Sequence, residues 1–147
     1  MEKTYRIGDL ARAAVVPVET IRYYERDGLI PSARRTAGNF RVYLESDRER
    51  LVFIRQCRAL DMTLDEVRAL LALKDTPQAN CADVNALVDS HLLHVTERIR
   101  ELQELKAELT TLRARCAKPR TVKNCAIVAD LSAGVATRAT KRRGVHG

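Results

Sequence analysis

The sequence predicts a mainly α-helical protein, in which a winged helix-turn-helix domain is followed by one long helix and a short C-terminal loop. Near the N-terminus, two short stretches of helically spaced apolar residues are separated by a tight turn and followed by a hairpin signal. Further along, residues 83–115 contain no proline or glycine and repeat apolar residues at coiled-coil spacing. We therefore expect a winged helix-turn-helix domain over 1–75, a dimerisation helix and loop over 76–131, and a disordered basic tail over 132–147.

Composition limits the possible functions. The 147 residues carry a net charge of +7, divided as +4 over residues 1–58, −3 over 59–116 and +6 over 117–147. Much of the basicity lies in the tail, so the total charge alone is weak evidence for nucleic-acid binding. The N-terminus lacks a signal peptide's apolar core and no run approaches the ~18 apolar residues of a membrane span, so we expect a cytoplasmic protein with no membrane partner. No phosphate loop or nucleophile–base pair of credible spacing is present, and we expect no enzymatic activity.

The helix-turn-helix is predicted in "RIGDLARAAVVPVETIRYYERDGLI". Pro17 fits the first turn of the second helix and Gly28 fits the position just past its end. Apolar residues recur at helical spacing through both helices, at Ile7, Leu10, Ala11, Ala14, Val18 and Ile21.

A small hairpin, the wing, is predicted in "PSARRTAGNFRVYL", where Gly38-Asn39 supplies the turn. Polar and amphipathic side chains on the second helix and basic or aromatic ones on the wing suit contacts with base edges and phosphates of double-stranded DNA. A solvated charged surface is the alternative interpretation. The predicted DNA-binding residues are Thr20, Arg22, Tyr23, Arg26, Arg34, Arg35, Arg41 and Tyr43.

Two further helices are expected after the wing, over roughly 47–60 and 64–73. Ser46 and Glu49 have capping-box spacing before the first, and Thr63 and Glu66 have it before the second. Cys57 falls on the first of these helices beside apolar residues, where a buried structural cysteine is expected.

The long helix predicts a homodimer, because it carries an apolar seam that needs a second helix to cover it. The apolar seam positions are Val84, Val88, Val95, Leu102, Leu105, Leu109, Leu112 and Cys116. The seam is interrupted by His91 and Arg98. A helix from Cys81 to Cys116 would rise about 50 Å, so these two thiols cannot meet within one chain. An antiparallel dimer would instead bring Cys81 of one subunit next to Cys116 and Cys125 of the other.

Three thiolates would form a soft site suited to Cd(II), Pb(II), Hg(II) or Zn(II). In "RCAKPRTVKNCAIV" the cations Lys118, Arg120 and Lys123 would favour the thiolate form, and the start of the long helix would do the same for Cys81. A disulfide between Cys116 and Cys125, or two small apolar fillers, are the alternatives. His91 and His94 stand at i, i+3 and could supply nitrogen ligands to a second site with His146, although a seam histidine is commonly a packed residue.

The segment from "YRIGDLARAAVVPVETIRYYERDGLIP" to "GNFRVY" resembles the N-terminal half of MerR-family transcriptional regulators, most clearly at "ETIRYYE" and "DGLIP". Through "ERLVFIRQCRALDMTLDEVRALL" and "CADVNALVDSHLLHV" the chain resembles the Cd(II)/Pb(II)-responsive branch of this family. The resemblance covers roughly residues 5–128. It carries the family's metal ligands onto Cys81, Cys116 and Cys125.

The resemblance implies a homodimeric repressor-activator that binds promoter DNA and, on binding metal, bends and untwists the operator so that RNA polymerase can engage. Cd(II) or Pb(II) is the expected inducer, with Hg(II) and Zn(II) as alternatives, and metal-export genes are the expected targets. His91 and His94 match a pair that contributes to a second site in some relatives, whereas this tail has only His146 in place of their histidine-rich end. A thiol-redox regulator and a small-molecule-responsive regulator are the competing functions, and the second would need more chain after the long helix.

Overall fold

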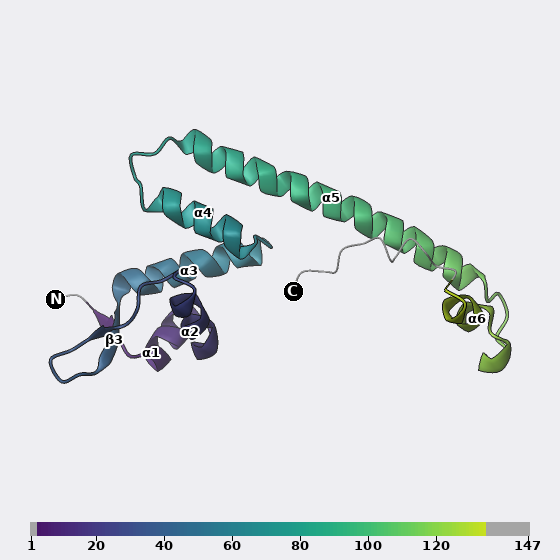
Figure 1. The fold of residues 1–147 in the computed structure, drawn as a ribbon, viewed down its shortest axis with the longest axis horizontal. Helices are drawn as coiled ribbons and strands as arrows, with labels where there is room; N and C mark the ends of the chain where they lie inside the picture. The colour runs from purple at the N-terminus through teal and green to yellow at the C-terminus, as the bar shows by residue number, and fades with distance from the viewer. Residues whose placement is uncertain (1–2, 135–147) are drawn as a thin grey trace. The chain divides into compact units, whose positions relative to one another are not determined.

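A computed structural model of the chain describes residues 3–134 (Figure 1). The chain forms two compact units, Met1–His91 and Leu92–Gly147. The predicted disordered tail lies largely outside the described residues, as does His146. Among the helices of residues 3–134, none has the length and apolar character required to cross a bilayer.

The first unit opens with the predicted helix-turn-helix, formed by α1 (Ile7–Ala14) and α2 (Val18–Arg26). Pro17 is the residue before α2 rather than part of its first turn, and Gly28 has a positive φ of 76° just past its end. The turn between the helices passes through Val15 in the left-handed conformation, with φ 57° and ψ 50°. This conformation is unfavourable for a β-branched residue, so the turn is strained at this position.

The wing contains the predicted hairpin and one strand that the sequence did not predict. Strand β3 (Arg41–Leu44) lies between β1 (Thr4–Tyr5) and β2 (Arg34–Arg35), and both pairings are antiparallel. Asn39 adopts a positive φ of 65° at the hairpin turn, and its backbone N–H donates to the Thr36 carbonyl at 2.8 Å. Tyr5 of β1 pairs with Tyr43 of β3, which attaches the N-terminus to the wing.

Helices α3 (Glu45–Ala59) and α4 (Leu64–Lys74) complete the domain's core. The predicted capping box at Thr63 is confirmed, since Thr63 and Glu66 exchange side-chain-to-backbone hydrogen bonds at 2.9 and 3.1 Å. The predicted box of Ser46 and Glu49 is wrong, because α3 begins earlier and the Leu44 amide donates to the Asp47 carboxylate at 2.7 Å.

One hydrophobic core joins these elements, and α1 packs against α2, α3 and β3 within it. Cys57 belongs to this core, as predicted, and burial raises the pKa of its thiol. The largest fully buried apolar side chains are Leu10, Ile21, Leu29, Ile30, Tyr43, Leu51, Ile54, Val67 and Leu71.

Helix α5 (Cys81–Ala114) begins in the first unit and continues through the second, and none of its residues is buried. Half of its apolar seam is exposed, with Val88, Val95, Leu102 and Leu109 all between 38 and 56% accessible, and the rest is half-buried. After α5 come the short helices η1 (Val122–Asn124) and α6 (Ala126–Ser132). Arg115 holds α6 against the end of α5 through an ion pair with Asp130 at 2.6 Å.

Candidate metal centre and nucleic-acid interface

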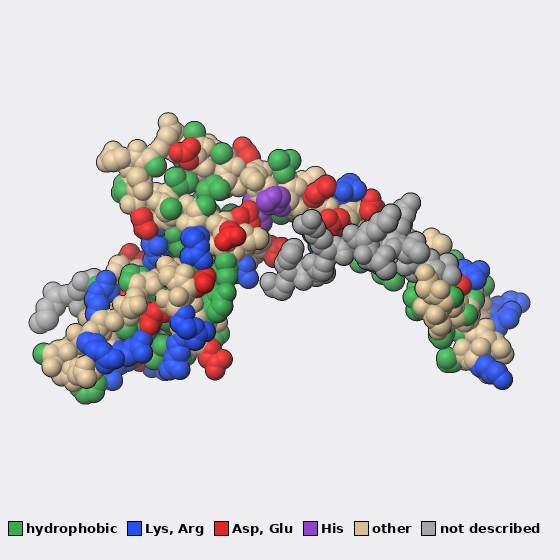
Figure 2. Space-filling model, in the orientation of Figure 1, with side chains coloured by type: hydrophobic (Ala, Val, Ile, Leu, Met, Phe, Trp, Pro, Cys, Tyr) green, Lys and Arg blue, Asp and Glu red, His purple; other side chains and the backbone are tan. Residues whose placement is uncertain are grey.

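Helix α2 exposes three of its four predicted DNA-contacting side chains to solvent. Arg22, Tyr23 and Arg26 are exposed and Thr20 is partly exposed, whereas Ile21 and Tyr24 of the same helix are buried in the core. The space-filling view shows Lys and Arg side chains gathered over the helix-turn-helix and wing (Figure 2). A cationic surface that includes an exposed helix can bind the phosphates and groove edges of a duplex.

The wing arginines are exposed but positioned by neighbours. Arg34 donates to the buried carboxylate of Asp47 at 3.3 Å, and Arg35 donates to the Asn39 carbonyl at 3.2 Å. These contacts fix both guanidinium groups on β2, just before the hairpin turn. Each group retains other N–H donors, so phosphate binding remains available to it.

Tyr43 and Arg41 converge on one carboxylate of α2. The Tyr43 hydroxyl donates to Glu25 at 2.5 Å, and the Arg41 guanidinium donates to the other oxygen at 2.6 Å. Burial, followed by the bond to Glu25, raises the pKa of Tyr43 to about 12. Because Tyr43 is only 1% exposed, its position favours a role in holding the wing to α2 rather than the DNA contact that we predicted.

Two arginines outside the predicted set secure the C-terminal end of α2. Arg68 of α4 donates to the carbonyl and the carboxylate of Asp27, at 3.0 and 2.8 Å. Arg50 of α3 donates to the Leu29 carbonyl at 2.7 Å and to Asp75 at 2.8 Å. These bonds connect segments far apart in sequence, which spacing rules do not reveal, and they position α2 from its C-terminal side.

Cys116 and Cys125 form a thiol pair at the end of α5. The pKa of Cys125 is lowered, first by the backbone N–H of Val128 and also by that of Ile127 and by the Cys116 thiol. The Cys116 thiol points to the Lys118 carbonyl, with the two atoms 3.5 Å apart. The N-terminal amides of α6 therefore stabilise the Cys125 thiolate, a source that we did not predict.

Cys81 is the first residue of α5 and is exposed. Cys116 follows the last residue of the same helix by two positions. A helix of 34 residues rises about 50 Å, so α5 separates these two thiols as the sequence predicted.

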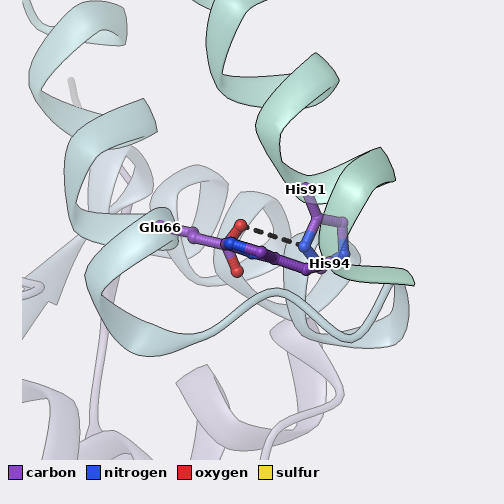
Figure 3. A group of neighbouring side chains, drawn as sticks. All are labelled: Glu66, His91 and His94. Carbon is purple, nitrogen blue, oxygen red and sulfur yellow. Dashed lines mark hydrogen bonds and ion pairs between the residues drawn. The ribbon is translucent and has the colours of Figure 1, made fainter. Parts of the chain in front are cut away.

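His91 is engaged through both ring nitrogens. Its Nδ1 lies 2.9 Å from the Glu66 carboxylate and its Nε2 lies 2.8 Å from the Leu60 carbonyl oxygen (Figure 3). Burial acts to raise the pKa of Glu66, but its bonds to Thr63 and the neighbouring His91 bring that pKa below the usual value. Glu66 was predicted only as a capping residue, so this long-range role was missed.

His94 lies one turn after His91 on α5 (Figure 3). Carboxylate and imidazole donors of the kind that Glu66 and His91 carry in the first unit can bind borderline cations such as Zn(II). A cation at His91 would have to displace Glu66 or the Leu60 carbonyl from one ring nitrogen, or share Glu66 as a ligand.

Two family models match the chain. The model described as MerR HTH family regulatory protein matches residues 5–74, and the one described as MerR, DNA binding, matches residues 48–112. Together the two matches include the helix-turn-helix, the wing, α3, α4 and most of α5.

Individual transcriptional regulators are similar to this chain in sequence and in structure. The Haemophilus influenzae protein named HTH-type transcriptional regulator ZntR homolog is 46% identical over 75% of this chain and 82% of its own length. The transcription regulator PbrR691 from Ralstonia metallidurans CH34, solved in complex with lead(II), is 49% identical, with a TM-score of 0.77 over 86% of this chain and 98% of that one. The Bacillus megaterium MB1 regulator MerR, solved with mercury(II), is 30% identical, with a TM-score of 0.68 over 87% of this chain and 99% of that one.

Proposed function

Because this chain belongs to the MerR family of helix-turn-helix transcriptional regulators, we propose that it controls metal-resistance or efflux genes in response to a soft divalent cation, with Cd(II) or Pb(II) favoured. The observation that carries this proposal is the thiol pair of Cys116 and Cys125, with the pKa of Cys125 lowered. A thiol whose pKa is lowered binds a soft cation at a lower pH, since the thiolate is the ligand.

The third ligand in this proposal is Cys81 of a second copy of the chain. The exposed apolar seam of α5 supports a homodimer, because coiled-coil residues of this kind are stable when a second helix covers them. If the two helices run in opposite directions, the start of one lies beside the end of the other. Each dimer would then hold two sites with three thiolates each, a donor set that suits Cd(II), Pb(II), Hg(II) and Zn(II).

We assign promoter DNA to the surface formed by α2 and the wing. The exposed residues Arg22, Arg26 and Arg35 supply positive charge there, and α2 has the exposed polar face that a recognition helix needs. Metal binding would shift the equilibrium between two conformations of the dimer, provided that the metal binds one of them more tightly. Distorting a short duplex costs on the order of 1–6 kcal/mol, which lies within the range of such a difference, and would let RNA polymerase engage the promoter.

A second, weaker cation site at His91 and His94 forms part of this proposal. Glu66 is added to it because its carboxylate already bonds His91 Nδ1. Zn(II) suits this nitrogen and oxygen donor set better than Pb(II) does. The thiol site and this site would therefore differ in metal preference.

Transcription from the operator, measured with the purified dimer and each of Cd(II), Pb(II), Hg(II) and Zn(II), tests the proposal. Changing Cys81, Cys116 or Cys125 singly to serine should abolish metal-induced transcription while operator affinity stays largely intact. Metal affinity should fall by more than the ~10–100-fold loss typical of an outer-shell residue. Cys57→Ala is the matched control, because this thiol is buried in the core and should leave the metal response unchanged. A normal response in any of the three serine variants would remove that residue from the site.

The pairing of Cys116 with Cys125 also supports a redox-responsive regulator as a second candidate. Thiols titrated before and after oxidant, with and without Cd(II), separate the two functions. A metal sensor should lose accessible thiols on binding Cd(II) and respond to it under fully reducing conditions. A redox regulator should respond to oxidant without metal and lose that response when either cysteine is changed to serine.

A further inference from the structure

Glu25 is an acidic residue inside the cationic surface that we assign to DNA. It lies on α2 near the exposed Arg22 and Arg26, and its side chain is only 12% exposed. A carboxylate at this position opposes phosphate binding by its charge. Its presence in the interface therefore calls for a local explanation.

Tyr43 fixes this carboxylate in place. The hydroxyl of Tyr43 is held by the core and donates to Glu25 Oε2 at 2.5 Å, so this oxygen has a rigid donor. The phenol keeps its proton over the physiological range because its pKa is raised to about 12. Oε1 of Glu25 is consequently presented to Arg41 in a fixed orientation.

The bond to Arg41 is of a different kind. The Arg41 side chain is 56% exposed, and it meets Glu25 at 2.6 Å on the outside of the wing. Because the Arg41 side of the pair is exposed, solvent screens it and Arg41 can change partner, whereas a buried neutral donor such as the Tyr43 hydroxyl does not leave without cost. A DNA phosphate can therefore replace Glu25 as the partner of Arg41 without disturbing Tyr43.

We propose that Glu25 competes with DNA phosphate for Arg41, so that binding of the wing to DNA requires Arg41 to exchange one anionic partner for another. Free protein then keeps the Arg41 charge neutralised on α2, and the wing attracts DNA less strongly than its arginine content indicates. This inference rests on the DNA surface of the proposed function but not on metal sensing.

A double-mutant cycle tests the exchange. Wild type, Glu25→Gln, Arg41→Gln and the double variant are compared for binding to a short mixed-sequence duplex over a range of salt concentrations. The glutamine at position 25 can still accept from the Tyr43 hydroxyl, so the wing should stay attached. Thermal melts of all four proteins establish that they are folded.

Glu25→Gln should bind the duplex about two- to five-fold more tightly at low salt, since the ion pair with Arg41 no longer has to be broken. Arg41→Gln should bind more weakly and reduce the slope of log K against log salt by about 0.9 for each protomer in contact. In the Arg41→Gln background, the tightening caused by Glu25→Gln should disappear.

Glu19→Gln is the matched charge control, because Glu19 is exposed on the same helix and the described residues give it no hydrogen bond or ion pair. Its effect should be the same in the wild-type and the Arg41→Gln backgrounds. If Glu25→Gln tightens DNA binding equally in both backgrounds, the effect comes only from the lost negative charge near the DNA, and the exchange is refuted. Weaker DNA binding by Glu25→Gln would also refute the exchange. An Arg41→Gln variant with the wild-type salt slope would refute it too, because Arg41 would then make no phosphate contact. That result would leave the proposed DNA binding by α2 intact.

Discussion

Replacing Val15 by glycine should stabilise the protein, although it removes an apolar side chain. Val15 adopts φ 57° and ψ 50° in the turn between α1 and α2, and its N–H donates to the Ala11 carbonyl. For an L-residue with a Cβ atom this left-handed conformation brings the Cβ too close to backbone oxygen. Glycine has no Cβ and adopts this conformation without that contact.

The expected gain is the difference between two effects. Relief of the left-handed conformation contributes about 1–2 kcal/mol, and the larger conformational entropy of glycine in the unfolded chain removes about 0.5–1 kcal/mol. The side chain of Val15 is 66% exposed, so its removal loses little buried apolar area. A net increase of up to about 1.5 kcal/mol in the free energy of unfolding follows.

Urea unfolding followed by circular dichroism measures this difference, with all proteins at the same protomer concentration. With a slope of about 1–3 kcal/mol per molar urea, the midpoint for Val15→Gly should rise by a few tenths molar at unchanged slope. Val15→Ala is the control, because alanine keeps the Cβ atom and most of the strain. A lower midpoint for Val15→Gly, or an equal rise for Val15→Ala, would show that the Cβ at this position is not the source of strain.

Two further predictions concern pH. The backbone N–H groups of α6 lower the pKa of the Cys125 thiol, so its rate of alkylation by iodoacetamide should reach half its maximum at a lower pH in the folded protein than in urea. Mass spectrometry measures the extent of alkylation at each pH, and equal pH profiles would contradict this prediction. The phenol of Tyr43 has a higher pKa in the folded protein, about 12, than its ordinary value of 10.0. Its contribution to the free energy of unfolding should therefore be complete below pH 10 and be lost as the pH rises to 12. Urea unfolding at several pH values measures this loss, and the Tyr43→Phe variant should not show it.

The sequence predicted the helix-turn-helix, the wing hairpin and the later helices because each depends on local signals. Helical spacing, Gly28 past the end of α2 and the turn at Asn39 all act within a few residues. Strand β1 was missed because two residues carry no periodicity, and it exists only through its pairing with β3. The start of α3 was misplaced because two carboxylates have capping spacing there, and the one that caps the helix is Asp47, which also accepts from Arg34 of the wing.

The candidate sites were predicted less completely, because their contacts join distant parts of the sequence. Glu66 reads as a capping residue, and nothing near it indicates His91, which lies 25 positions later. The sequence places Tyr43 on the exposed wing, but its side chain is buried in the core and its hydroxyl donates to Glu25. Residue types and spacing identify candidate ligands, whereas the partner of each side chain depends on the tertiary fold.

At the thiol site, local contacts bring together only part of the proposed ligand set. Cys116 and Cys125 come together because the loop after α5 is short and Arg115 holds α6 through Asp130. Cys81 stands at the other end of a helix of 34 residues, which rises about 50 Å and has no proline or glycine at which to bend. If Cys81 is the third ligand, a second chain must supply it, and metal affinity then includes the free energy of dimerisation. Substitutions in the exposed seam of α5 would weaken metal sensing without touching a ligand, because they act on the equilibrium that brings the thiols together.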